Sequence, residues 1–104
     1  MSGLWCANEE GEAATERVIL RQALDTYGLE HQRNICIEEM SELTKELCKD
    51  ARGSEVLPHI AEEIADVKLI LQQMEIGYGI EHEVAQWYGY KLERLRQRME
   101  GLAE

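Results

Sequence analysis

The sequence lacks the features that mark several classes of protein. Its 104 residues include no phenylalanine and one proline, Pro58, so long stretches contain no helix-breaking proline. The three cysteines are odd in number and form no CxxC pair, which predicts neither a zinc site nor a disulfide framework, and we expect reduced thiols and a cytoplasmic location. No run of about 18 apolar residues occurs, and residues 1–12 have neither a basic start nor an apolar run. We therefore expect no membrane span and no signal peptide.

Basic residues are scarce as well. Eleven Lys and Arg stand against 21 Asp and Glu, which gives a formal net charge of −10. Contacts to phosphates supply much of the affinity for DNA and RNA, so this charge argues against a nucleic-acid polymer as partner. A small anionic ligand fits the sequence if bound metal ions reverse the sign of the charge locally.

The apolar residues recur at three- and four-residue steps, which predicts an all-α fold. We expect residues 1–12 to form a flexible N-terminal arm and residues 13–104 to form one helical domain. Glycines and Pro58 divide this domain into four predicted helices, over residues 13–27, 30–52, 58–76 and 80–101. The expected architecture resembles a four-helix bundle in which the apolar stripes pack inward. The inward positions of the second and third helices are Cys36, Met40, Leu43 and Leu47, and Ile60, Ile64, Val67, Leu71 and Met74. The fourth helix carries an apolar stripe at alternating four- and three-residue steps, formed by Tyr88, Leu92, Leu95, Met99 and Leu102.

One six-residue pattern occurs twice, as EEMSEL over residues 38–43 and EEIADV over residues 62–67. Each copy contains a pair of acids three residues apart, and such a pair projects from one helix face about one turn apart. The pairs are Glu39 with Glu42 and Glu63 with Asp66. Antiparallel packing of the two helices would bring both pairs to one edge of the core. Carboxylates held this close raise one another's pKa unless cations neutralise them, and hard divalent cations take oxygen ligands.

These two motifs at this spacing, with Lys91 and Arg94 in the last predicted helix, resemble the signature of the MazG-like all-α nucleoside triphosphate pyrophosphohydrolases. The resemblance covers roughly residues 18–100. It implies Mg²⁺-dependent hydrolysis of (deoxy)nucleoside triphosphates to the monophosphate and pyrophosphate, in a role of nucleotide-pool house-cleaning, with Mn²⁺ as the alternative ion. It also implies a bundle completed by oligomerisation, as a homodimer or homotetramer.

The same resemblance assigns a role to each matching residue. The implied metal ligands are Glu39, Glu42, Glu63 and Asp66. Glu38 is the remaining acid of the first motif and is expected to orient a water molecule or act as a base. Gln32 is expected beside the nucleotide, and Lys91 and Arg94 are expected to face its phosphates. No set of base-reading residues stands out, so the sequence leaves the preferred nucleotide open.

Two other functions fit the same sequence. A non-catalytic helical interaction or regulatory module would keep the fold without any dependence on metal. A pyrophosphohydrolase acting on another phosphoanhydride, such as phosphoribosyl-ATP, would share the acid motifs. A single acidic pair would indicate an ordinary solvated helix face. Two copies at matching positions of the repeated pattern favour a metal-binding site instead. The basic row of Lys91, Arg94 and Arg98 fits a solvated face paired with nearby acids equally well.

Overall fold

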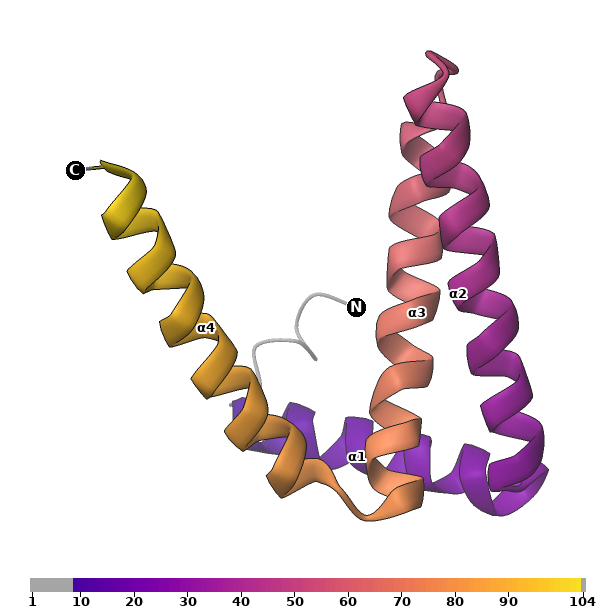
Figure 1. Ribbon diagram of the computed structural model, residues 1–104. Helices are drawn as coiled ribbons and strands as arrows, with labels where there is room; N and C mark the ends of the chain where they lie inside the picture. Colours follow the sequence, from indigo (N-terminus) through magenta and orange to yellow (C-terminus); the bar gives the residue numbers. More distant parts are fainter. Residues whose placement is uncertain (1–8, 104) are drawn as a thin grey trace.

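The computed structural model describes residues 9–103, which form four α-helices and, over that range, no strand. The helices are α1 (Glu9–Tyr27), α2 (Leu29–Ala51), α3 (Leu57–Tyr78) and α4 (Glu81–Ala103), shown in Figure 1. The predicted all-α class is confirmed. Helices α2, α3 and α4 begin and end within two residues of the predicted positions, whereas α1 begins four residues before the predicted start. Residues 9–12, which we expected in the arm, are therefore helical, and the rest of the arm lies outside the described residues.

Glycine and proline set the boundaries of the helices. Pro58 occupies the first turn of α3, where its missing N–H would have had no helical partner. Gly79 ends the same helix in the left-handed conformation, at φ 68° and ψ 35°, and its N–H donates to the carbonyl of Ile76 at 3.1 Å. A side chain would strain this backbone, so Gly79 lets the chain leave α3 and start α4 in a new direction.

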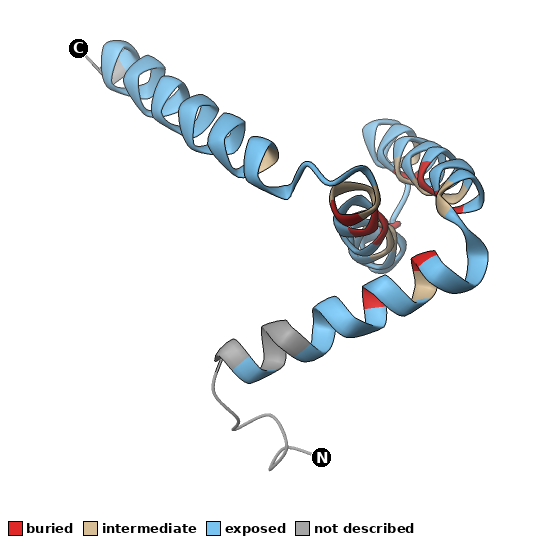
Figure 2. Cartoon of the chain, turned by 90° about the horizontal axis from the view of Figure 1, so that it is seen from below, coloured by how far each residue is buried: buried red, intermediate tan, exposed pale blue. Residues whose placement is uncertain are grey.

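Helices α2 and α3 form a long antiparallel hairpin, and α1 crosses the base of this hairpin (Figure 1). Helix α4 leaves the same base and points away from the other three helices. Seen from below in Figure 2, α4 is exposed along nearly its whole length, and Val84 is its one described residue that is half-buried. No helix among the described residues is both long and apolar enough to cross a membrane.

The buried core lies at the base, where α1 meets α3. Leu20 and Leu24 of α1 pack with Ile76 of α3, and Leu29 lies against them. Gly77 permits this approach, because a Cβ at that position would lie 2.6 Å from Cδ1 of Leu29. Burial of each leucine or isoleucine stabilises the fold by about 1.5–3 kcal/mol, so this small cluster fixes α1 on the hairpin.

The contact between α2 and α3 differs from the prediction. We expected the apolar stripes to meet, but four of their members are 40–50% exposed, namely Met40, Leu47, Ile64 and Leu71. Three of the residues buried in the two helices are polar instead, namely Gln32 and Glu46 on α2 and Gln73 on α3. The other buried residues are Cys36 on α2 and Ile70 and Ile76 on α3. Each helix is thus rotated about its axis relative to the predicted packing, which turns part of its apolar stripe to solvent.

The fourth predicted stripe is also uncovered in the single chain. Its members are 52–79% exposed, namely Tyr88, Leu92, Leu95, Met99 and Leu102. The expected four-helix bundle is therefore not closed by α4 within one chain. The physical reason is the direction set at residues 79–80, which carries α4 away from the hairpin (Figure 1).

Candidate metal centre

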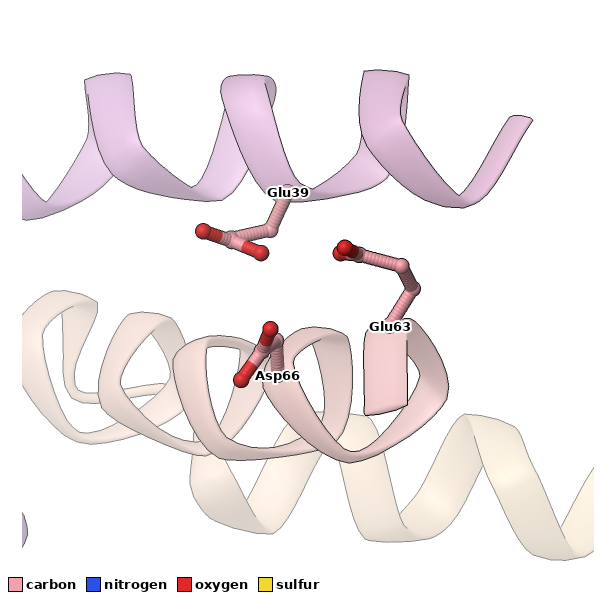
Figure 3. Close-up of side chains that lie close together, drawn as sticks. All are labelled: Glu39, Glu63 and Asp66. Carbon is pink, nitrogen blue, oxygen red and sulfur yellow. The ribbon is translucent and has the colours of Figure 1, made fainter. Parts of the chain in front are cut away.

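Three carboxylates from the two repeated motifs meet between α2 and α3. Glu39 points from α2 toward Glu63 and Asp66 of α3 (Figure 3). One carboxylate oxygen from each residue lies within 4.8 Å of the other two. The i,i+3 spacing puts Glu63 and Asp66 one turn apart on α3, and the antiparallel hairpin places Glu39 opposite that turn. The expectation that the motifs come together is correct for these three acids, which we call the acid cluster.

The acid cluster is electrostatically unfavourable by itself. The pKa of Glu39 is raised above its ordinary value of 4.5, first by burial and then by the charges of Asp66 and Glu63. Glu63 Oε2 is buried and has no hydrogen-bond partner in the described part of the chain. Among the described residues, no lysine or arginine forms an ion pair with any of the three acids.

These properties fit a hard divalent cation. All three side chains offer oxygen atoms, which Mg²⁺ and Mn²⁺ prefer to nitrogen or sulfur. A cation among them would interact favourably with each carboxylate and would give Glu63 Oε2 a partner. An orphaned buried oxygen in a native protein calls for such an explanation. The donor set therefore matches the metal implied by the sequence motifs.

The other acids of the first motif lie outside the cluster. Glu42 and Glu38 are exposed on α2, and Glu42 is not among the acids whose oxygens lie within 4.8 Å of one another. Glu42 is three residues from Glu39 and so stands about one turn away on the same helix. The structure thus groups three of the four predicted ligands.

Gln32 is buried and held by two neighbours. Its Nε2 donates to Oε1 of Gln73 on α3 at 2.7 Å, and Nδ1 of His31 lies 2.9 Å from its Oε1. Both polar groups of this amide are therefore engaged within the chain. This arrangement fixes the orientation of the side chain that the sequence resemblance placed beside the nucleotide.

The predicted phosphate-facing residues are not brought to the acid cluster within one chain. Lys91 and Arg94 lie on exposed turns of α4, which diverges from the hairpin (Figure 1). The guanidinium carbon of Arg94 lies 5.9 Å from the centre of the Tyr90 ring, so Arg94 makes a local cation–π contact. Arg96, which we had not singled out, forms ion pairs with Glu93 and Glu100.

Sequence reasoning missed two buried polar residues of the α2–α3 hairpin, Gln73 and Glu46. Glu46 is 8% exposed, and its Oε1 accepts a hydrogen bond from Lys49 at 3.2 Å. A seven-residue step could have revealed both, because residues seven apart fall almost on one line of a helix. Gln32, Glu39 and Glu46 follow this step on α2, and Asp66 and Gln73 follow it on α3.

No family model, curated protein or solved structure matches this chain.

Proposed function

We propose that this protein is a Mg²⁺-dependent nucleoside triphosphate pyrophosphohydrolase of the MazG-like type, which hydrolyses (deoxy)nucleoside triphosphates to the monophosphate and pyrophosphate. The observation that carries the proposal is the meeting of Glu39, Glu63 and Asp66, with oxygens within 4.8 Å of one another. Acids on ordinary solvated helix faces have no reason to converge from two helices into a partly buried cluster.

The residue types suit this reaction. Bound Mg²⁺ supplies charge neutralisation at the phosphates and lowers the pKa of a bound water molecule. Phosphoryl transfer depends mainly on positioning and charge stabilisation, so the chain needs no serine, cysteine or histidine nucleophile. Glu39, Glu63 and Asp66 would hold the metal, whereas Glu42, which lies outside the cluster, is not among the proposed ligands. Glu38 would orient or deprotonate the attacking water.

The proposed active form is a homo-oligomer, either a dimer or a tetramer. Lys91 and Arg94 stand on a helix that leaves its own hairpin, so they would face phosphates only through assembly of two or more chains. Gln32 is buried and its amide is engaged by Gln73 and His31, so it is left out of the proposed contacts to the nucleotide. The site would then combine an acid half and a basic half around the anionic substrate.

The test is pyrophosphate release from a panel of ribo- and deoxyribonucleoside triphosphates, first with MgCl₂ or MnCl₂ and then with excess chelator. We expect metal-dependent release by the wild type and a loss of at least about 100-fold in Glu39→Gln, because the variant loses a carboxylate that would hold the cation whose charge stabilises the transition state. Glu62→Gln is the matched control, since it alters an exposed acid beside the cluster. Full activity of Glu39→Gln would refute the metal assignment.

One observation favours a second function, a helical interaction module. The described part of α4 presents a long exposed apolar stripe, with Tyr88 at 69% and Leu102 at 79% exposure. Exposed apolar surface of this kind marks a site of protein association. A folded protein that neither binds Mg²⁺ in calorimetry nor releases pyrophosphate from any nucleotide would support this function over hydrolysis.

A further inference from the structure

One face of α4 carries aromatic and basic side chains and lies outside the apolar stripe of that helix. Trp87 begins this face, and Lys91, Arg94 and Arg98 follow it by four, seven and eleven residues, which places all four on one side of the helix. Tyr90 stands beside them. We call these five residues the aromatic–basic face. Successive residues of an α-helix are rotated by about 100°, which turns this face well away from the apolar stripe.

The two aromatic rings of this face are exposed and hold each other in place. Trp87 and Tyr90 are 62% and 59% exposed, and their rings form a T-shaped pair with centroids 5.9 Å apart and planes at 90°. The guanidinium carbon of Arg94 lies 5.9 Å from the centre of the Tyr90 ring. Contacts of these two kinds favour one orientation of each ring over the others. The face therefore presents an ordered indole ring next to positive charge.

The positive charge of this face is not neutralised by the acids nearby on α4. Glu93 and Glu100 form ion pairs with Arg96, which lies on the other side of the helix. Among the residues that the structure describes, none of the three basic residues of the face takes part in an ion pair. Like charges one turn apart on a helix repel each other. An anion beside them would remove this repulsion, so the face suits an anionic ligand even in a chain of net charge −10.

An exposed ring beside unpaired cations fits a ligand that carries both a flat π-system and phosphates. Nucleobases stack on aromatic side chains, and phosphate oxygens accept hydrogen bonds from Lys and Arg. The rise of the helix puts Lys91 and Arg94 about 6 and 10 Å along the axis from Trp87, so a base and a phosphate chain can contact different residues at once. Glu83, one turn before Trp87, would repel phosphates and so directs the anionic end of the ligand toward Lys91.

We propose that the base of the nucleotide substrate stacks on Trp87, that Tyr90 holds the indole ring in position, and that Arg98 adds a contact to the phosphates. The inference rests on the proposed function for the identity of the ligand, and it assigns the base to residues outside both acid motifs. Assembly that brings Lys91 and Arg94 to the acid cluster also brings Trp87, because the three share one face of α4. Stacking accepts every base, since each has a π-face, so we expect this site to hold several different bases.

The test compares two ligands that share a chain of three phosphorus groups and differ in the base. Isothermal titration calorimetry in MgCl₂ gives the Kd of α,β-methylene-ATP, whose α–β bridge resists hydrolysis, and the Kd of inorganic tripolyphosphate. We expect Trp87→Ala to weaken binding of the nucleotide by about 5-fold to 150-fold, as for the loss of one base–aromatic stack, and to leave the Kd of tripolyphosphate within about twofold of the wild type. Trp87→Phe keeps an aromatic ring and should recover most of the affinity for the nucleotide.

The matched control is Tyr88→Ala, because Tyr88 is the neighbouring aromatic residue, is 69% exposed and belongs to the apolar stripe. This variant should leave the ratio of the two Kd values unchanged, whereas Trp87→Ala should change it. An unchanged ratio in Trp87→Ala would overturn the proposal, as would an equal change of the ratio in both variants. A folded wild-type protein that binds neither ligand would overturn it as well.

Fluorescence provides a measurement that leaves the aromatic–basic face intact. The chain has two tryptophans, so Trp5→Phe makes Trp87 the single tryptophan. Saturating α,β-methylene-ATP should quench its emission, because a stacked base contacts the indole ring, whereas tripolyphosphate should not. Equal emission with both ligands would overturn the proposal. Pyrophosphate release is measured separately: hydrolysis without this difference refutes only the stacking inference, and stacking on Trp87 without any hydrolysis refutes only the proposed function.

Discussion

Replacing Glu39 with glutamine should stabilise the metal-free protein. Burial, and then the charges of Asp66 and Glu63, raise the pKa of the Glu39 carboxyl above its ordinary value of 4.5. A raised pKa means that the folded chain binds this proton more tightly than the unfolded chain does. The free energy of unfolding therefore falls as the pH rises from the ordinary value through the raised pKa, and the loss is complete above that raised pKa. Glutamine keeps the size of the side chain and removes the charge.

The spacing of the carboxylates gives the magnitude. At the 4.8 Å limit of their separation, Coulomb's law in bulk water gives about 0.9 kcal/mol for each neighbouring carboxylate. Glu39 has two such neighbours, and salt screens part of the repulsion. We therefore expect Glu39→Gln to raise the free energy of unfolding by about 1–2 kcal/mol. For a domain of this size, each kcal/mol raises the melting temperature by about 4–8 °C.

The assay is thermal unfolding followed by circular dichroism in chelator, at neutral pH and near pH 4. The difference between wild type and Glu39→Gln should shrink at the lower pH, where Glu39 is largely protonated. Adding MgCl₂ should raise the melting temperature of the wild type more than that of the variant. Glu62→Gln, at an exposed acid, should change little. A variant that melts at or below the wild-type temperature in chelator would refute the view that these carboxylates repel one another.

Three further predictions concern packing and assembly. Gly77→Ala should destabilise the fold by about 1–3 kcal/mol in urea unfolding, because the new Cβ would lie 2.6 Å from Leu29 Cδ1. An unchanged midpoint of urea unfolding would mean that α1 shifts freely. Gln73→Leu should cost about 1–3 kcal/mol because it leaves the buried Gln32 amide without its acceptor, and adding Gln32→Leu should recover part of this loss. The wild-type melting temperature should rise with protein concentration, as expected for a folded state stabilised by self-association, and a constant value would contradict this.

The helices could be predicted from the sequence because their signals are local. Apolar periodicity, Pro58 in a first turn and glycines at the breaks locate α2, α3 and α4 within two residues. The packing of the helices could not be predicted in the same way. Periodicity shows that Met40 and Ile64 belong to apolar stripes, but it does not show which element covers them. In the structure the hairpin turns both residues outward.

The candidate site shows the same division between local and tertiary information. Glu63 and Asp66 are fixed by a spacing of three residues, and a short connection fixes the antiparallel partner that brings Glu39 to them. The position of Lys91 and Arg94 relative to the acids depends on the direction of α4, for which these motifs carry no signal. The contact between Gln32 and Gln73 depends on the register of the hairpin, which apolar periodicity does not specify.

On the α2–α3 hairpin, polar residues share the inner surface with apolar ones while other apolar residues stand outside, and this arrangement agrees with the proposed metal site and the proposed homo-oligomer. Gln32, Glu39 and Glu46 lie along the inner line of α2, where buried polar groups lower stability unless they are paired. Apolar side chains that could have filled this line, such as Met40 and Leu47, stand outside it. A chain selected for the stability of its monomer would place them the other way round. Polar residues inside are explained if that line binds a cation and its anionic ligand, and apolar residues outside are explained if a second hairpin covers them. The pattern that repeats after 24 residues supplies both the acids between the helices and the apolar residues on their outer surface. Each copy carries acids that face the other helix next to apolar residues that face away from it.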